Sequence, residues 1–207
     1  AHRHGLKTVV GAWISNDRER NKREVASLIN LCKAGYVDIA VVGNEVLLRE
    51  ELSEKEVISY LEYVRQQTTG IPVTYIDAYY QLLQRPGLAA ACDVLLVNCY
   101  PFWEGCDIED AAAYLQYMYH LVKDQAQGKE VMIAETGWPS EGSTQLQAVP
   151  NKANAIKYFV NTTKWQQKEN VPLFYFSSFD ESWKARQEGD VGARWGLWDK
   201  NEKLKYS

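Results

Sequence analysis

Two glutamates stand where apolar segments of the chain end. Glu45 follows V-V-G-N, and Glu135 follows V-M-I-A. A charged residue in such a place is often simply solvated. Two carboxylates that face one site are also the minimum equipment for glycoside hydrolysis, in which one group protonates the leaving oxygen and the other attacks the sugar carbon or activates water. The pair by itself leaves both interpretations open.

The segments that carry these glutamates belong to an alternating pattern of strands and helices. Apolar residues at helical spacing separate the predicted strands, and Ser53 with Glu56 forms a capping-box pattern at the start of one predicted helix. The strands are apolar on both faces, which is typical of a parallel sheet covered by helices. The predicted strands span residues 8–14, 38–45, 73–78, 94–101, 131–135 and 173–180.

Each predicted strand ends in polar or aromatic residues. In parallel α/β folds, ligands bind at the carboxyl ends of the strands, and a barrel brings all of these ends to one mouth. A doubly wound sheet would instead carry a glycine-rich phosphate loop, and neither G-x-G-x-x-G nor G-x-x-x-x-G-K occurs. We therefore predict an α/β fold of the (β/α)8 TIM-barrel type, with six of the eight βα units visible and one partial catalytic domain over residues 1–207.

Composition and charge exclude several classes of partner. The net charge is −4, so no basic field is available for nucleic acid or an anionic membrane. No apolar run approaches the roughly 20 residues of a membrane span. The four cysteines form no C-x-x-C, so a zinc site is not expected, and no histidine–carboxylate cluster suggests another metal. No cofactor is expected. Cys99 and Cys106 flank one loop and could either pair or remain free thiols.

Three segments carry a resemblance to a known family. In this order, V-V-G-N-E-V, A-E-T-G-W-P-S and F-D-E-S-W-K resemble the signature of the family 17 glycoside hydrolases, which are β-1,3-glucanase-type enzymes on (β/α)8 barrels. The final W-G-L-W-D-K-N-E-K-L-K-Y resembles the closing segment of these domains, and the bacterial branch is the most similar. The resemblance implies a retaining glycoside hydrolase or transglycosylase that acts on β-1,3-linked or mixed β-glucans.

The resemblance also implies roles for individual residues. Glu45 matches the general acid/base and Glu135 the nucleophile, and retention predicts that their carboxyl groups lie about 5–5.5 Å apart. Asn44 is expected to bind the sugar 2-hydroxyl. Glu181 and Lys184 match a pair near the nucleophile, where a lysine would favour the ionised form of a neighbouring carboxylate. An ordinary surface ion pair is the alternative for these two residues.

Aromatic residues at the strand ends are expected to bind the sugar, because pyranose faces present apolar C–H groups to aromatic rings. Trp138, next to the predicted nucleophile, is the expected platform. Tyr75 and Tyr100 are expected to hydrogen-bond sugar hydroxyls or the nucleophile. Trp13 and Trp183 are further candidates. Packing in the core is the alternative for each of these side chains.

The chain is shorter than a complete barrel of this type. It has 207 residues, whereas eight-unit barrels typically need roughly 250. By the resemblance, we expect it to begin at the family's third strand, as a fragment, a natural short form, or a barrel completed by another chain or by an N-terminal segment. Open sheet edges at residues 8–14 and 173–180 would promote oligomerisation or lower stability.

Three classes of function follow from these observations. The first is an enzyme whose partner is a β-glucan oligosaccharide or polysaccharide, with hydrolysis and transfer left unranked. The second is a catalytically impaired carbohydrate-binding barrel fragment. The third, a phosphate-binding α/β enzyme, lacks its glycine loop. By resemblance, an enzyme of the first class would act extracellularly, in the periplasm or at the cell envelope.

Overall fold

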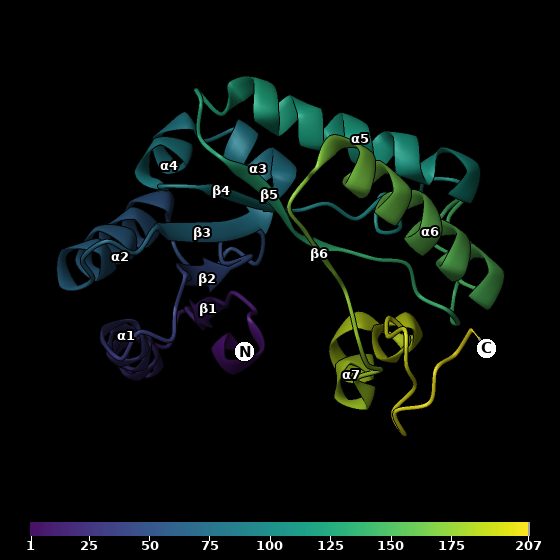
Figure 1. The fold of residues 1–207 in the computed structure, drawn as a ribbon, viewed down its shortest axis with the longest axis horizontal. Helices are drawn as coiled ribbons and strands as arrows, with labels where there is room; N and C mark the ends of the chain where they lie inside the picture. Colours follow the sequence, from purple (N-terminus) through teal and green to yellow (C-terminus); the bar gives the residue numbers. More distant parts are fainter. Residues whose placement is uncertain (207) are drawn as a thin grey trace. The chain divides into compact units, whose positions relative to one another are not determined.

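The computed structural model describes residues 1–206. Within them, six β-strands form one sheet, with helices between the strands (Figure 1). They are hydrogen-bonded in chain order, and the pairs β1–β2, β2–β3 and β5–β6 are parallel. The strands are β1 (Val9–Ala12), β2 (Ile39–Asn44), β3 (Val73–Ala78), β4 (Leu95–Asn98), β5 (Val131–Thr136) and β6 (Leu173–Tyr175). The predicted alternation of strands and helices in an α/β fold is confirmed.

Helices connect the strands. The α-helices are α1 (Arg18–Lys33), α2 (Glu54–Gln67), α3 (Tyr79–Leu83), α4 (Pro86–Ala91), α5 (Ile108–Gln125), α6 (Lys152–Glu169) and α7 (Ala185–Glu188). Three short 3-10 helices are η1 (His2–His4), η2 (Ser182–Lys184) and η3 (Asp190–Ala193). None of the helices within residues 1–206 combines the length and the hydropathy that crossing a membrane requires.

The chain forms two compact units. The first comprises Ala1–Val97 and Leu121–Met132, and the second comprises Asn98–His120 and Ile133–Ser207. The expectation of one domain over residues 1–207 stays a prediction.

In the first unit, helices α1 and α2 lie alongside strands β1 to β3 (Figure 1). Leu28 of α1 and Leu61 of α2 are buried together with Val41 of β2. The predicted capping box begins α2: the Glu56 N–H donates to Ser53 Oγ, and the Ser53 N–H donates to Glu56 Oε2 across 2.9 Å. Local sequence therefore fixes where this helix starts.

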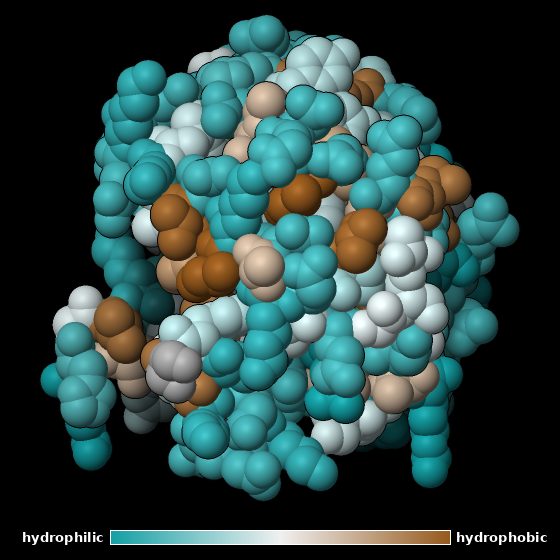
Figure 2. Space-filling view, turned by 90° about the vertical axis from the view of Figure 1, so that its right-hand side faces the viewer, coloured by the Kyte–Doolittle hydropathy of each residue, from teal (hydrophilic) through white to brown (hydrophobic). Residues whose placement is uncertain are grey.

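In the second unit, α5 and α6 lie side by side (Figure 1), and Lys157 of α6 forms an ion pair with Glu109 of α5. Asn151 caps α6 by accepting a hydrogen bond from the Asn154 N–H across 2.8 Å. Ile133 of β5 is buried in the core of this unit. The face shown in Figure 2 is mainly hydrophilic, with apolar residues in small separate groups, as is normal for a protein surface.

The last strand is shorter than the sequence predicts. The predicted strand covers residues 173–180, but β6 ends at Tyr175. Beyond a cis peptide bond between Phe176 and Ser177, the backbone hydrogen-bonds to a later segment instead. The Ser177 N–H donates to the Trp195 carbonyl, and the Asp180 N–H donates to the Trp198 carbonyl. Carbonyl groups near the end of the chain therefore accept the backbone hydrogen bonds that this segment donates.

Candidate active site

Glu135 and Tyr100 meet at neighbouring strand ends of the second unit. Glu135 is the fifth residue of β5, and Tyr100 lies two residues beyond the end of β4. The Cys99 N–H donates to the Glu135 carbonyl across 2.9 Å, which aligns the two backbones. The Tyr100 hydroxyl then donates to Glu135 Oε2 across 2.8 Å. The expected hydrogen bond between Tyr100 and the candidate nucleophile is thus present.

Aromatic rings surround the phenol of Tyr100. Its ring packs edge-on against Trp195 with centroids 5.3 Å apart, and against Phe176 with centroids 6.2 Å apart. Trp195 also contacts Trp103, with centroids 5.5 Å apart. Such contacts fix the orientation of Tyr100 and hence the direction of the hydrogen bond that it donates.

Glu181 and Lys184 form the expected ion pair, with Lys184 Nζ 2.7 Å from Glu181 Oε2. Lys184 is largely buried, and its Nζ lies 3.9 Å from the ring centroid of Phe176. Phe176 in turn contacts Tyr100. Through Phe176, the pair is therefore linked to the aromatic cluster that packs around Tyr100. An isolated surface ion pair would have no such contact.

A buried ion pair in the same unit was not foreseen from the sequence. Lys205 Nζ lies 2.8 Å from Asp180 Oδ1, and the two side chains are 7% and 4% exposed. The same Nζ donates to Ser140 Oγ across 2.7 Å. Burial lowers the pKa of Lys205, and the hydrogen bond to Asp180 opposes that shift. The pair joins the loop after β5 to the segment after β6 and to the end of the chain.

The backbone of the first unit turns sharply at Glu45. Glu45 follows β2 with a positive φ of 55°, a conformation that is uncommon for a residue with a side chain. Gly43 has a φ of 88°, and a Cβ there would lie 2.8 Å from Val46 Cγ2. Glycine is therefore required in V-V-G-N-E. The Glu45 N–H donates to the Ile76 carbonyl across 2.9 Å, which anchors the turn to β3.

Tyr75 lies inside the first unit and not on its surface. Its side chain is 0% exposed, and its hydroxyl accepts a hydrogen bond from the Leu47 N–H across 2.9 Å and donates one to Asp77. Burial raises the pKa of both the Tyr75 hydroxyl and the Asp77 carboxyl. The structure thus gives Tyr75 a place in the core, beneath the chain that follows Glu45, and no surface for a sugar.

Trp138 is also a core residue. Its indole is 1% exposed, packs against Phe102 and Tyr158, and donates from Nε1 to the Val149 carbonyl across 3.1 Å. A stacking platform needs an exposed ring face, so burial corrects the expectation of a sugar platform here. Pairing of the indole N–H with the loop before α6 explains why a tryptophan follows the strand end.

Two of the predicted aromatics do lie at the surface. Trp13, directly after β1, is 41% exposed, and Trp183, in η2, is 60% exposed. The Arg49 guanidinium lies 4.6 Å from the ring centroid of Trp13. Trp13 belongs to the unit of Asn44 and Glu45, whereas Trp183 belongs to that of Glu135. Each candidate carboxylate therefore has an exposed tryptophan in its own unit.

Glu45 and Glu135 belong to different units, so the expected separation of about 5–5.5 Å between their carboxyl groups stays a prediction.

Cys99 and Cys106 are both free thiols, and burial raises the pKa of Cys99. Within residues 1–206, no group of three or more His, Cys, Asp and Glu side chains is arranged to hold a metal ion.

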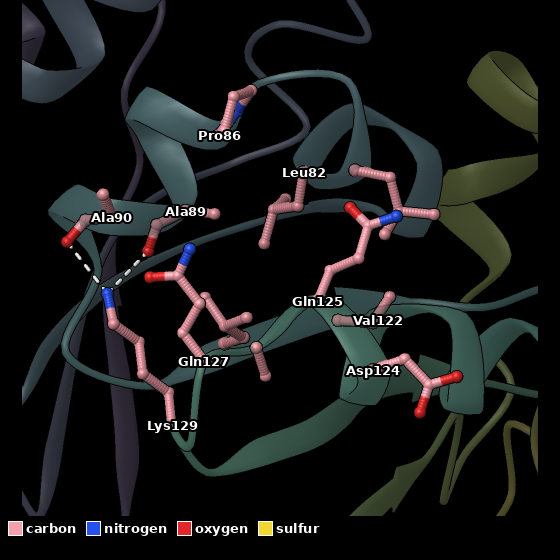
Figure 3. Close-up of a pocket in the computed structure, with 12 residues that line it drawn as sticks. Leu82, Pro86, Ala89, Ala90, Val122, Asp124, Gln125, Gln127 and Lys129 are labelled. Atoms are coloured by element: carbon pink, nitrogen blue, oxygen red, sulfur yellow. Dashed lines mark hydrogen bonds between the residues drawn. The ribbon is translucent and has the colours of Figure 1, made fainter.

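A hollow of about 340 Å³ lies in the first unit, away from Glu45 (Figure 3). It lies beside Leu95, the first residue of β4, and so at the opposite end of that strand from its carboxyl terminus. Lys129 borders it and donates to the carbonyls of Ala89, Ala90 and Cys92 across 2.6–2.8 Å. These bonds cap the end of α4, which indicates that this end of the fold serves stability.

Comparison with known proteins places the chain among carbohydrate-active domains. Residues 1–196 match the family described as BtgE/BtgC glycoside hydrolase domain. The glucan 1,3-beta-glucosidase BGL2 of Candida albicans is 25% identical over 237 aligned positions, covering 100% of this chain and 75% of BGL2. The glucan endo-1,3-beta-glucosidase btgC of Emericella nidulans is 26% identical over 97% of this chain, which spans 35% of btgC.

Solved structures agree with this assignment. The glycoside hydrolase family 17 beta-1,3-glucanosyltransferase of Rhizomucor miehei has 31% identity and a TM-score of 0.89, over 99% of this chain and 76% of the enzyme. An active-site mutant of that enzyme in complex with laminaritriose has 30% identity and the same TM-score of 0.89. The (β/α)8-type fold prediction is confirmed, whereas the bacterial branch stays a prediction, since the curated relatives named here are fungal. From the match over residues 1–196 and this likeness to a family 17 structure, the chain belongs to the family of BtgE/BtgC glycoside hydrolase domains.

Proposed function

We propose that this chain is a retaining glycoside hydrolase or transglycosylase that acts on β-1,3-linked glucans. Membership of the glycoside hydrolase family supports the reaction class. The names of the relatives and the laminaritriose complex of the Rhizomucor miehei enzyme support the substrate class. The observation that carries the mechanism is the hydrogen bond from the Tyr100 hydroxyl to Glu135 Oε2.

In this proposal Glu135 is the nucleophile. A carboxylate oxygen of Glu135 forms a bond to the anomeric carbon of the sugar while the bond from that carbon to the glycosidic oxygen breaks. The Tyr100 hydroxyl orients the carboxylate and stabilises its negative charge before the attack, because hydrogen bonds to charged groups are stronger than those between neutral groups. Lys184 contributes positive charge to the same cluster.

Glu45 is the general acid and base. Its carboxyl group gives a proton to the departing glycosidic oxygen, and the resulting carboxylate later removes a proton from the incoming hydroxyl. That hydroxyl attacks the anomeric carbon and releases Glu135 from the glycosyl-enzyme ester. Asn44 binds the 2-hydroxyl of the sugar, an interaction that strengthens in the transition state.

The acceptor decides between hydrolysis and transfer. Water gives hydrolysis, whereas a sugar hydroxyl held at the site gives a longer glucan. Exposed aromatic rings are the surface on which an acceptor or a donor sugar can stack, and the proposal assigns this role to Trp13 and Trp183. Tyr75 and Trp138 support the site from within the core and do not touch the substrate.

The test compares the wild-type chain with Glu135→Gln on laminari-oligosaccharides, with products separated by chromatography. Glu130→Gln, an exposed glutamate just before β5, is the matched control. We expect products from the wild type and the control and none from Glu135→Gln. Products longer than the starting sugar would identify transfer. Binding of the sugars by all three proteins without any product would instead identify a carbohydrate-binding fragment.

A further inference from the structure

The turn that carries Glu45 needs support from its surroundings. A left-handed backbone is strained at a residue with a side chain, and Glu45 adopts it with a φ of 55°. Such a conformation persists when neighbouring contacts determine it. Two backbone bonds, from the Glu45 N–H to Ile76 and from the Arg49 N–H to the Glu45 carbonyl, are each 2.9 Å long. The second of these bonds involves Arg49.

The side chain of Arg49 returns to the same turn. Its Nη1 donates to the Asn44 carbonyl across 2.7 Å, so it binds the peptide group that directly precedes Glu45. Its Nη2 lies 3.5 Å from the Ile14 carbonyl, just after β1. A guanidinium has several donors in one rigid plane and can bind two strand ends at once, whereas an ammonium group is a point charge.

Glu51 fixes the guanidinium from the other side. Glu51 Oε2 accepts from Arg49 Nε across 3.1 Å and from Nη2 across 2.9 Å. The two side chains are 29% and 24% exposed, so the pair is partly shielded from solvent. Both edges of the guanidinium thus have partners, and the orientation of its plane is determined.

The face of the guanidinium lies against Trp13. The Arg49 Cζ is 4.6 Å from the ring centroid of this exposed indole, within the range of a cation–π contact. Arg20 is also near the ring, at 5.9 Å, but it belongs to α1 and forms an ion pair with Glu24 of the same helix. One side chain, that of Arg49, therefore contacts both the exposed tryptophan and the turn.

We propose that Arg49 is a positioning residue that holds the Asn44–Glu45 turn and couples it to the Trp13 platform. The inference rests on the proposed function, in which Glu45 is the general acid and base. A sugar stacked on Trp13 then contacts the ring that packs against the Arg49 guanidinium. The same guanidinium keeps the Glu45 carboxyl directed at the glycosidic oxygen. An arginine with only a structural surface role would need no contact with the Asn44 carbonyl.

The experiment uses the dependence of the rate on the leaving group. Proton donation matters for a sugar leaving group, whereas a dinitrophenolate leaves without it. We compare kcat/KM for laminari-oligosaccharides and for dinitrophenyl β-laminaribioside in the wild type, Arg49→Met, Arg49→Lys and Glu45→Gln. Arg20→Met is the matched control, because it removes a cation from the same indole and leaves the turn intact. Melting temperatures identify any variant that fails to fold.

The proposal predicts a selective loss. Arg49→Met lowers kcat/KM for the oligosaccharide by roughly 100-fold, the scale of a misplaced catalytic group, and changes it less than about threefold for the dinitrophenyl substrate. Arg49→Lys has an intermediate effect with the same selectivity and supplies the test if Arg49→Met does not fold. Arg20→Met affects both substrates equally.

The outcomes separate the two levels of the proposal. An equal loss on both substrates in the Arg49 variants, or no loss, would overturn the positioning role while Glu45→Gln still shows the selective loss. An equal loss on both substrates in Glu45→Gln would overturn the acid/base assignment itself. Selective losses in both Glu45→Gln and the Arg49 variants would support both.

Discussion

The hydroxyl of Tyr100 donates a hydrogen bond to Oε2 of Glu135 across 2.8 Å, and the Cys99 N–H donates to the backbone carbonyl of the same glutamate. Glu135 is thus held twice from the segment that follows β4, at its backbone by Cys99 and at its carboxylate by Tyr100. A carboxylate held in this way keeps one orientation, which is what a nucleophile that attacks a sugar carbon requires.

Removal of the Tyr100 hydroxyl should slow the reaction without unfolding the chain. A hydrogen bond to a charged group contributes about 1.5–3 kcal/mol, so Tyr100→Phe should lower kcat/KM roughly 10- to 150-fold on laminari-oligosaccharides. The phenyl ring retains the packing against Trp195, so the melting temperature should change little. Steady-state kinetics and thermal unfolding measure both quantities.

Tyr114→Phe is the matched control for this variant. The Tyr114 hydroxyl also donates to a carboxylate, that of Glu104, but on an exposed surface of the same unit. Its loss should leave kcat/KM unchanged. An equal effect of the two substitutions would mean that the Tyr100 hydroxyl has no special relation to the reaction.

Gly137 should not tolerate even a methyl group. A Cβ at this position would lie 2.0 Å from the Phe176 carbonyl oxygen, where β5 and β6 approach each other. Overpacking typically costs about 1–3 kcal/mol, and backbone atoms yield less than side chains, so Gly137→Ala should lower the free energy of unfolding by at least that much. Denaturant unfolding measures the loss.

Gly11→Ala provides the comparison, since a Cβ there would meet Val41 at an ordinary 3.7 Å. We expect its free energy of unfolding to change by less than about 1 kcal/mol. If Gly11→Ala and Gly137→Ala lowered the free energy of unfolding equally, the claim that Gly137 has no room for a Cβ would be contradicted.

Breaking the buried ion pair of Asp180 and Lys205 should destabilise the second unit. Removing one partner of a buried pair typically costs about 3–5 kcal/mol, because the other charge stays buried and unpaired. Lys205→Met should therefore destabilise strongly, and Lys205→Met with Asp180→Leu should recover part of the loss. The exposed pair of Lys22 and Glu19 is the control, with an expected contribution of about 0–1 kcal/mol. Equal effects of Lys205→Met and Lys22→Met in denaturant unfolding would contradict this account.

The capping box should give α2 a pH-dependent contribution to stability. The Ser53 N–H, followed by the Ser53 hydroxyl, lowers the pKa of Glu56 below its ordinary value of 4.5. A lowered folded-state pKa means that the stabilisation is present above the unfolded value and is lost as the pH falls through the folded value. The difference in free energy of unfolding between the wild type and Glu56→Gln should thus be constant near neutral pH and shrink in acid. A difference that does not change with pH would contradict the assignment.

Much of the fold was predictable from local sequence. Apolar segments set apart by turn residues located all six strands, and Ser53 with Glu56 marked the start of α2. The end of β6 was not predictable, because Ser177 and Asp180 hydrogen-bond to residues near the end of the chain. Local sequence indicates a strand, but not which segment pairs with it.

The site was predictable only in part. Position after a strand correctly indicated that Tyr100 reaches Glu135, but it did not show whether Tyr75 and Trp138 face a sugar or the core. The Tyr75 hydroxyl and the Trp138 indole N–H both donate hydrogen bonds to groups of the protein itself. Asp180 and Lys205 lie 25 residues apart, and no local sequence pattern pairs them.

The central claim is that Glu135 forms a covalent bond to the sugar. Incubation with a 2-deoxy-2-fluoro-β-laminaribioside that has an activated leaving group should trap this ester, because the fluorine slows its breakdown. Peptide mass spectrometry of the digested protein should then find the sugar on Glu135, and Glu135→Gln should remain unlabelled. A label on another carboxylate, or full activity without any covalent label, would contradict the account.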